Sequence, residues 1–174
     1  MKCIIDTNVP LKASNINVSD KLDAQCSYAC LRFIQSIMNS NNTIIVLDSA
    51  GEILKEYNTN FQSNGQDTVA TIFLKWIHRN LTLREKSQVE QQYLTVTGDR
   101  EYAEFPKSPS LNGFDRSDRK FIAVANAHLE HPQIVEGSDS LWWRFKDALE
   151  ELGIHIYFLC EDYVKTKYEE TYYD

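Results

Sequence analysis

The sequence predicts an α/β fold: a three-layer α/β/α sandwich around a central, mostly parallel sheet. Short, continuous apolar runs such as TIIVL at 43–47 are typical of strands that are buried on both faces. These runs alternate with longer stretches in which apolar residues recur at helical spacing. Alternation of this kind indicates parallel strands that are joined by right-handed helical crossovers.

The strand candidates comprise four clear runs and one weaker run. The clear runs are 2–6, 43–47, 133–137 and 154–159, and the weaker one is YLTVT at 93–97. Helical patterns occupy the segments between them: Leu22 to Ile37, SAGEILKEYNTNF at 49–61, Val69 to Ile77, Phe121 to Leu129 and Leu141 to Leu152. Gly153 is placed to end the last of these helices.

The stretch from Leu81 to Gly113 interrupts this alternation. We expect a helix, a short edge strand and then an irregular loop there, inserted around 98–114 into a single domain that spans 1–174. The loop is a candidate lid or substrate-contacting segment, and an ordinary surface loop fits the pattern at least as well.

Length and charge narrow the function classes. A chain of 174 residues suits one domain, and its net charge of −7 argues against tight, sequence-blind wrapping of nucleic acid. That charge does not exclude an enzyme that holds nucleic acid locally and releases it. No apolar run approaches the roughly 20 residues of a membrane span, and no signal peptide is visible, so we expect a cytoplasmic protein.

The four cysteines are Cys3, Cys26, Cys30 and Cys160. Cys26 and Cys30 are one helical turn apart on an apolar face, and the other two lie in apolar, strand-like runs. No further Cys or His pair has the spacing of zinc ligands. We therefore expect buried free thiols rather than a disulfide framework or a zinc site.

Acidic residues follow several of the predicted strands. Asp6 ends the first strand, Asp48 ends the second, and Asp139 lies just past the strand at 133–137. Parallel sheets bind ligands outside the carboxyl ends of their strands, so these side chains are expected at one edge. We expect Asp48 only to cap the helix that follows it.

Further acids lie in the helices beyond these strand ends. Glu52 and Glu56 are four residues apart, hence on one helix face, and Asp115 and Asp118 are three apart at a helix start. Clustered carboxylates repel one another, and a hard divalent cation such as Mg²⁺ or Mn²⁺ relieves that repulsion. Such a centre suits hydrolysis of phosphodiester bonds.

Four segments in this order resemble the motifs of the PIN-domain family: IIDTNV, EILKEYNTNF, FDRSDRKFIAVA and IVEGSDSLWW. The resemblance extends from Met1 to about Cys160. It implies a three-layer fold with a parallel sheet and nuclease activity that depends on Mg²⁺ or Mn²⁺, commonly on RNA. Many bacterial members are toxins of toxin–antitoxin pairs, which implies an antitoxin-like protein regulator.

The resemblance also implies a set of site residues. The metal-binding and catalytic acids would be Asp6, Glu56, Asp118 and Asp139, with Glu52 and Asp115 as additional acids and Asn8 and Ser138 as hydrogen-bonding neighbours. Leu141 stands where many members carry a further aspartate, which implies a weaker second metal position or none.

The leading interpretation is a metal-dependent nuclease, and first among these an endoribonuclease. We expect it in the cytoplasm, and a homodimer is one form that the sequence leaves open. Arg116, Arg119 and Lys120 would contact phosphates or would form a solvated helix face that balances the nearby acids. A catalytically degenerate domain that binds nucleic acid or protein is the alternative. A flavodoxin-like phosphoacceptor is disfavoured because the last strand, IHIYFL, has no lysine.

Overall fold

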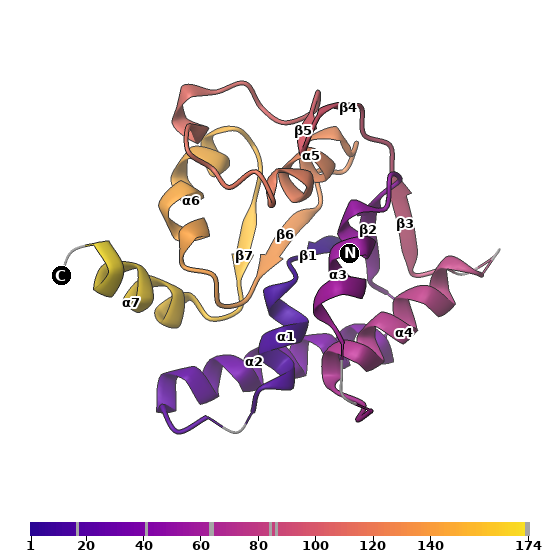
Figure 1. The fold of residues 1–174 in the computed structure, drawn as a ribbon, viewed down its shortest axis with the longest axis vertical. Coiled ribbons are helices and arrows are strands. Elements are labelled where there is room, and N and C mark those ends of the chain that lie inside the picture. The colour runs from indigo at the N-terminus through magenta and orange to yellow at the C-terminus, as the bar shows by residue number, and fades with distance from the viewer. Residues whose placement is uncertain (17, 41, 63–64, 84, 86, 173–174) are drawn as a thin grey trace.

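Five short strands form one parallel sheet in the order β3-β2-β1-β6-β7, which confirms the predicted α/β class (Figure 1). The computed structural model describes residues 1–16, 18–40, 42–62, 65–83, 85 and 87–172. The strands are β1 (Lys2–Ile5), β2 (Ile44–Asp48), β3 (Val89–Gln92), β6 (Gln133–Glu136) and β7 (Ile156–Phe158). The central strands are apolar on both faces because helices cover both.

The order of the strands reverses beside β1. From β1 the chain moves outward through β2 to β3, and it then returns to the other side of β1 to form β6 and β7. The ends of β1 and β6 therefore flank a topological switch point, where the loops diverge and leave space for a ligand.

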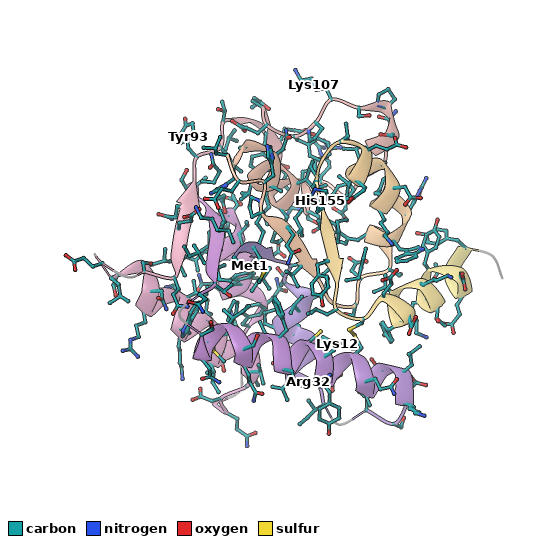
Figure 2. The ribbon with its side chains drawn as sticks, turned by 180° about the vertical axis from the view of Figure 1, so that it is seen from behind. Met1, Lys12, Arg32, Tyr93, Lys107 and His155 are labelled. Atoms are coloured by element: carbon teal, nitrogen blue, oxygen red, sulfur yellow. A yellow bond between two sulfur atoms is a disulfide. The ribbon has the colours of Figure 1, made fainter. Side chains whose placement is uncertain are left out.

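The helices form the two outer layers. They are α1 (Asn8–Ser14), α2 (Lys21–Asn39), α3 (Glu52–Asn60), α4 (Val69–Leu81), α5 (Arg119–Ala127), α6 (Leu141–Glu151) and α7 (Glu161–Tyr172). The helices α1, α2 and α4 pack together, whereas α5 lies against β1, β2 and β6. Side chains fill the space between these layers and the sheet (Figure 2). No helix in the described part of the chain is long and apolar enough to cross a membrane.

The region between α4 and α5 differs from the prediction. Residues 89–92, whose sequence VEQQ is too polar to stand out, form the edge strand β3, and no α-helix lies between Leu81 and Gly113 in the residues described there. The predicted strand at 93–97 is only partly confirmed, since 93–95 lie outside any strand. Val96–Gly98 (β4) instead pairs antiparallel with Glu101–Tyr102 (β5) in a small hairpin. A short 3₁₀ helix, η1 (Pro109–Leu111), follows.

Two helix ends also test the sequence pattern. Gly153 has a φ of 76° and donates its N–H to the carbonyl of Glu150, so it ends α6 as predicted. Leu129 was expected on the buried stripe of α5, but α5 ends at Ala127 and Leu129 is 93% exposed. The apolar pattern therefore places the end of this helix two residues too late.

The prediction of four free cysteines is wrong. Cys26 of α2 and Cys160, which follows β7, form a disulfide, and Cys3 and Cys30 remain as buried thiols. No local pattern indicates this pair, because its two cysteines are 134 residues apart and meet only when α2 packs beside the start of α7.

The disulfide makes a testable prediction. Denatured without reductant, the protein should take up two alkylating groups, at Cys3 and Cys30, and four after reduction. Mass spectrometry measures both numbers. In the chain-entropy model, opening a link across 134 residues lowers the free energy of unfolding by up to about 5 kcal/mol. A thermal melt with reductant should show the loss.

The matched variant is Cys160→Ser, which should melt as low without reductant as the wild type does with it, and should then ignore reductant. Four alkylated positions in the unreduced protein would contradict the disulfide.

Candidate metal site

Asp6 lies at the carboxyl end of the central strand, directly beside the switch point. Its side chain is only 2% exposed, and its backbone N–H donates to the carbonyl of Val135 in β6 at 3.0 Å. The carboxylate Oδ1 accepts the backbone N–H of Asn8 at 2.8 Å. The sequence had marked Asn8 as a hydrogen-bonding neighbour of the first acid, and its main chain makes this bond.

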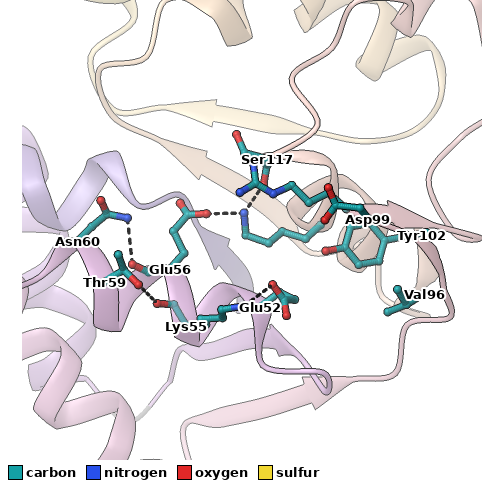
Figure 3. A pocket seen from close by; sticks show the side chains of 12 residues that line it. Glu52, Lys55, Glu56, Thr59, Asn60, Val96, Asp99, Tyr102 and Ser117 are labelled. Atoms are coloured by element: carbon teal, nitrogen blue, oxygen red, sulfur yellow. Dashed lines mark hydrogen bonds and ion pairs between the residues drawn. The ribbon is translucent and has the colours of Figure 1, made fainter.

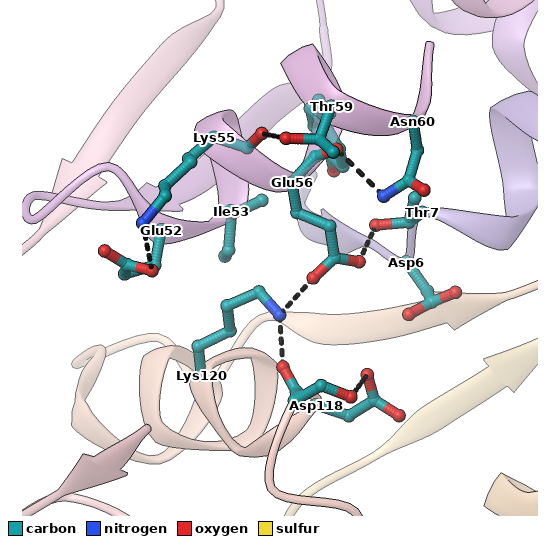
Figure 4. A network of polar contacts seen from close by, with 12 residues as sticks. Asp6, Thr7, Glu52, Ile53, Lys55, Glu56, Thr59, Asn60, Asp118 and Lys120 are labelled. Atoms are coloured by element: carbon teal, nitrogen blue, oxygen red, sulfur yellow. Dashed lines mark hydrogen bonds and ion pairs between the residues drawn. The ribbon is translucent and has the colours of Figure 1, made fainter. Parts of the chain in front are cut away.

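The helix α3 carries Glu56 to the same place. The buried hydroxyl of Tyr57 donates to the carbonyl of Ile5, which fixes α3 against the end of β1. The hydroxyl of Thr7 donates to Glu56 Oε1 (Figure 4). Two independent hydrogen bonds therefore connect α3 with the residues on either side of Asp6.

The start of α3 depends on Asp48. Its buried carboxylate accepts the backbone N–H groups of Glu52 and Ile53, each at 2.8 Å, which satisfies two free donors of the first turn. Asp48 therefore acts at the helix N-terminus, as the sequence predicted. Gly51 precedes the helix with a φ of 79°, a conformation that a side chain would disfavour.

The two glutamates of α3 have different surroundings. Glu56 contacts Thr7, and its charge raises the pKa of Asp6. Glu52 lies one turn earlier and has its Oε2 3.8 Å from Lys55 Nζ on the outer surface of the helix. The structure brings Glu56 to the cluster around Asp6, whereas Glu52 lines the open space beside it.

The two aspartates before α5 also separate. Asp115 accepts the backbone N–H and the hydroxyl of Ser117 through Oδ1, both at 2.7 Å, and so closes an exposed turn. Asp118 occupies the N-cap position of α5 without making a capping hydrogen bond. It is half-buried, and burial together with the negative charge of Asp6 raises its pKa.

The strand β6 contributes an acid that the sequence reasoning missed. Glu136 ends β6, is fully buried, and accepts three backbone N–H groups through Oε1, at 2.8 Å from Gly137, 3.1 Å from Ser138 and 2.9 Å from Asp139. It therefore shapes the turn that presents Asp139. The rule that identified Asp6, an ionisable residue at the end of a buried strand, could have identified Glu136 as well.

The other oxygen of Glu136 is unusual. Its Oε2 is buried without a donor among the described residues, and the Glu136 carboxyl lies beside that of Asp6. Two such carboxyls form a hydrogen bond only where one of them holds a proton. Gly137 leaves no room for a side chain here, since a Cβ would lie 3.2 Å from Cys30 Sγ and 3.3 Å from the Val9 Cα.

Burial raises the pKa of four carboxyls at this point, those of Asp6, Asp118, Glu136 and Asp139. It raises the pKa of Asp6 to about 6 and that of Asp118 to about 8, and the negative charge of Asp6 adds to the shift of Asp118. Burial likewise raises the pKa of Glu136 well above its ordinary value and raises that of Asp139. The carboxylates are thus strained by desolvation and by one another, which is the condition that a bound cation relieves.

Three basic residues neighbour the third acid, and each has a protein partner. Arg116 and Arg119 both pair with Glu101 of the hairpin, at 2.9 Å and 2.7 Å. Lys120 points inward, with its Nζ 2.5 Å from Glu56 Oε2. The predicted solvated face that balances Asp115 and Asp118 is therefore not how these side chains are arranged. Phosphate contacts by these residues stay a prediction.

An open cleft of about 630 Å³ lies beside the acids (Figure 3). One wall is α3, with Glu52, Glu56 and Asn60, and the opposite wall is the β4–β5 hairpin, with Asp99 and Tyr102. Lys120 lies where the cleft meets the acid cluster. For the loop around 98–114 the sequence left a substrate-contacting segment and an ordinary surface loop open, and most of the hairpin that borders this cleft lies in it.

The donor chemistry fits a hard cation that keeps part of its hydration. Asp6, Asp118 and Asp139 offer carboxylate oxygens, the ligands that Mg²⁺ and Mn²⁺ prefer. Among the described residues no three acids bring oxygens within 4.8 Å of one another; sulfur atoms of Cys26, Cys30 and Cys160 do so, and two of these are joined as a disulfide. An ion at the acids would therefore combine few carboxylates with water, as Mg²⁺ commonly does.

The raised pKa of Asp118 predicts how the metal-free protein responds to pH. The unfolded carboxyl ionises near its ordinary pKa of 3.8, whereas the folded one keeps its proton up to about 8. Between these values the folded state binds more protons, so stability should fall as pH rises. Thermal melts in EDTA across this range should show that fall.

The fall should be shallower in Asp118→Asn, and at the alkaline end this variant should melt above the wild type. Asp115→Asn is the matched control: hydrogen bonds from Ser117 lower the pKa of Asp115, and its charge adds less to the raised pKa of Asp118 than burial and the charge of Asp6 do, so most of the fall should remain. Parallel curves for wild type and Asp118→Asn would show that Asp118 does not cause the pH dependence.

Comparison of the chain with protein-family models, with curated proteins and with solved structures finds no match. The likeness of its four motifs to those of the PIN-domain family is therefore a resemblance of short segments. Any conclusion about function depends on the geometry of the acids and of the cleft beside them.

Proposed function

We propose that this protein is a metal-dependent nuclease that hydrolyses phosphodiester bonds, with an endoribonuclease as the preferred form. The observation that carries the proposal is the convergence of Asp6, Glu56, Asp118 and Asp139 from four separate segments at the switch point. A second support is the open cleft of about 630 Å³ that Glu56 and Lys120 line at the edge of this cluster. RNA is preferred over DNA only because of the family resemblance.

Each side chain has a stated task in this proposal. Asp6, Asp118 and Asp139 would hold Mg²⁺ or Mn²⁺ by carboxylate oxygens, directly or through water. Glu56, which contacts Thr7 and Lys120, would hold the Lys120 ammonium within the cluster. When bound, such an ion supplies Lewis-acid chemistry that activates water toward a phosphodiester. Glu136 holds the turn before Asp139 through three backbone N–H groups, so Asp139 keeps its position without a ligand.

The electrostatics suit a substrate that is held briefly. The net charge of −7 opposes tight binding of nucleic acid, and the described cations Lys55, Arg100 and Lys120 line the cleft. Affinity should therefore be local and salt-dependent. An antitoxin-like regulator is a further proposal that follows from the resemblance, and a cytoplasmic location and a homodimer are proposals that do not depend on it.

Asp6→Asn tests the site as a whole. The substitution keeps the size of the side chain and the acceptor for the Asn8 N–H, so the fold should persist while cleavage of RNA is lost by at least about 100-fold. The measurement is cleavage of labelled RNA and single-stranded DNA with Mn²⁺, with chelator as the metal-free control.

Cleavage at the wild-type rate by carefully purified Asp6→Asn would exclude this site. Binding of RNA by the wild type without cleavage in any metal would favour the alternative, a degenerate domain that acts as a binding module.

Glu56→Gln and Glu52→Gln form a matched pair on one helix. Glu56 contacts Thr7 and Lys120 in the cluster, whereas Glu52 is next to Lys55 on the rim. Glu56→Gln should therefore lose at least about tenfold more activity, a difference of about 1.4 kcal/mol in transition-state stabilisation. The same cleavage assay compares them, and a greater loss in Glu52→Gln would move the second acid one turn earlier.

A further inference from the structure

Lys120 is a buried cation inside the acid cluster. It is the second residue of α5 and is only 4% exposed. Lysine is almost never buried without a partner, so its contacts need to be identified. Its Nζ lies 2.5 Å from Glu56 Oε2 and also donates to the carbonyl of Ser117 (Figure 4). The ammonium is therefore anchored from both sides, by α3 and by the turn that precedes α5.

Glu56 differs from the other acids because of this contact. Its Oε1 accepts the hydroxyl of Thr7 and its Oε2 accepts Lys120, so both of its oxygens are engaged within the protein. The Oδ1 of Asp6 accepts the backbone N–H of Asn8, and the Oδ1 of Asp139 accepts that of Leu141. The Oδ2 atoms of these two aspartates take no part in these bonds. Among these acids Glu56 is the one in direct contact with Lys120, whose charge also acts on Asp118.

The position of the ammonium bears on the number of ions that can bind. A divalent ion on Glu56 Oε2 would need that oxygen at about 2.1 Å, the distance typical of Mg²⁺, while the Lys120 Nζ already occupies the approach at 2.5 Å. Two cations so close would also repel each other. A second ion on Glu56 would therefore have to displace Lys120 from a buried position.

We propose that Lys120 takes the place of a second metal ion, so that the site binds one divalent cation, on the side of Asp6, Asp118 and Asp139, and carries its other positive charge on the protein. This inference rests on the proposed function only in that the acids must bind a divalent cation. It does not depend on which reaction the protein catalyses. Because Lys120 also lines the cleft, its ammonium is placed to meet a phosphate there as a point charge.

The test counts Mn²⁺ ions by isothermal titration calorimetry on the full chain. Wild type should bind one Mn²⁺ per chain. Lys120→Met, which keeps the length of the side chain and removes its charge, should bind two because Glu56 becomes free. Lys55→Met is the matched control: Lys55 lines the same cleft but is largely exposed and next to Glu52, so this variant should still bind one.

A second readout covers poor folding of Lys120→Met. This variant should melt lower than wild type in EDTA and should gain more from Mn²⁺, because the extra ion replaces the lost ammonium. The double variant Glu56→Gln, Lys120→Met removes both charges, so it should return to one ion and to the smaller gain. A merely structural ion pair would lower the melting temperature without changing the number of ions.

The outcomes separate this inference from the proposed function. Two ions in wild type, or one ion in Lys120→Met, would overturn the role of Lys120 even if RNA is cleaved. One ion in wild type and two in Lys120→Met would support it even if no nucleic acid is cleaved, in which case only the nuclease proposal fails. Absence of Mn²⁺ binding in wild type would overturn both.

Discussion

The parallel pairing of β1 with its two neighbours is the constraint on which the site depends. Parallel strands end at one edge, and the reversal of strand order beside β1 separates the loops that follow β1 and β6. Asp6 and Glu136 end these two strands, so their carboxyls meet in the interior whatever the loops do. The other acids reach this point on helices that pack against the same strands.

Bringing carboxylates into a buried position has a large desolvation cost, and the protein offsets part of it with its own donors. The backbone N–H of Asn8 donates to Asp6, the hydroxyl of Thr7 donates to Glu56, and three consecutive backbone N–H groups donate to Glu136. Hydrogen bonds of this kind stabilise a charged carboxylate, but here burial still raises the pKa of Asp6. Either a proton or a bound cation can neutralise the charge that remains. The stability of the protein should therefore depend on both pH and metal binding at this site.

The β4–β5 hairpin turns this cluster into a cleft. Arg116 and Arg119 connect the turn before α5, and α5 itself, with Glu101 of β5, so the hairpin is held on the same unit that carries Asp118. The guanidinium of Arg119 also lies 4.9 Å from the ring centre of Phe105. These contacts explain why a segment rich in proline and polar residues keeps a defined position opposite α3. They also leave Lys120 as the basic residue that faces inward.

The sequence by itself determined the fold class and much of the candidate site. Continuous apolar runs required buried parallel strands, and strand-end position singled out Asp6 and Asp139. Edge strand β3 was missed because its sequence, VEQQ, carries little apolar signal. Only the tertiary structure placed Glu56 against Thr7, turned Lys120 inward and joined Cys26 to Cys160. Each of these depends on contacts between segments at least 49 residues apart, and such contacts have no local period that a sequence pattern could reveal.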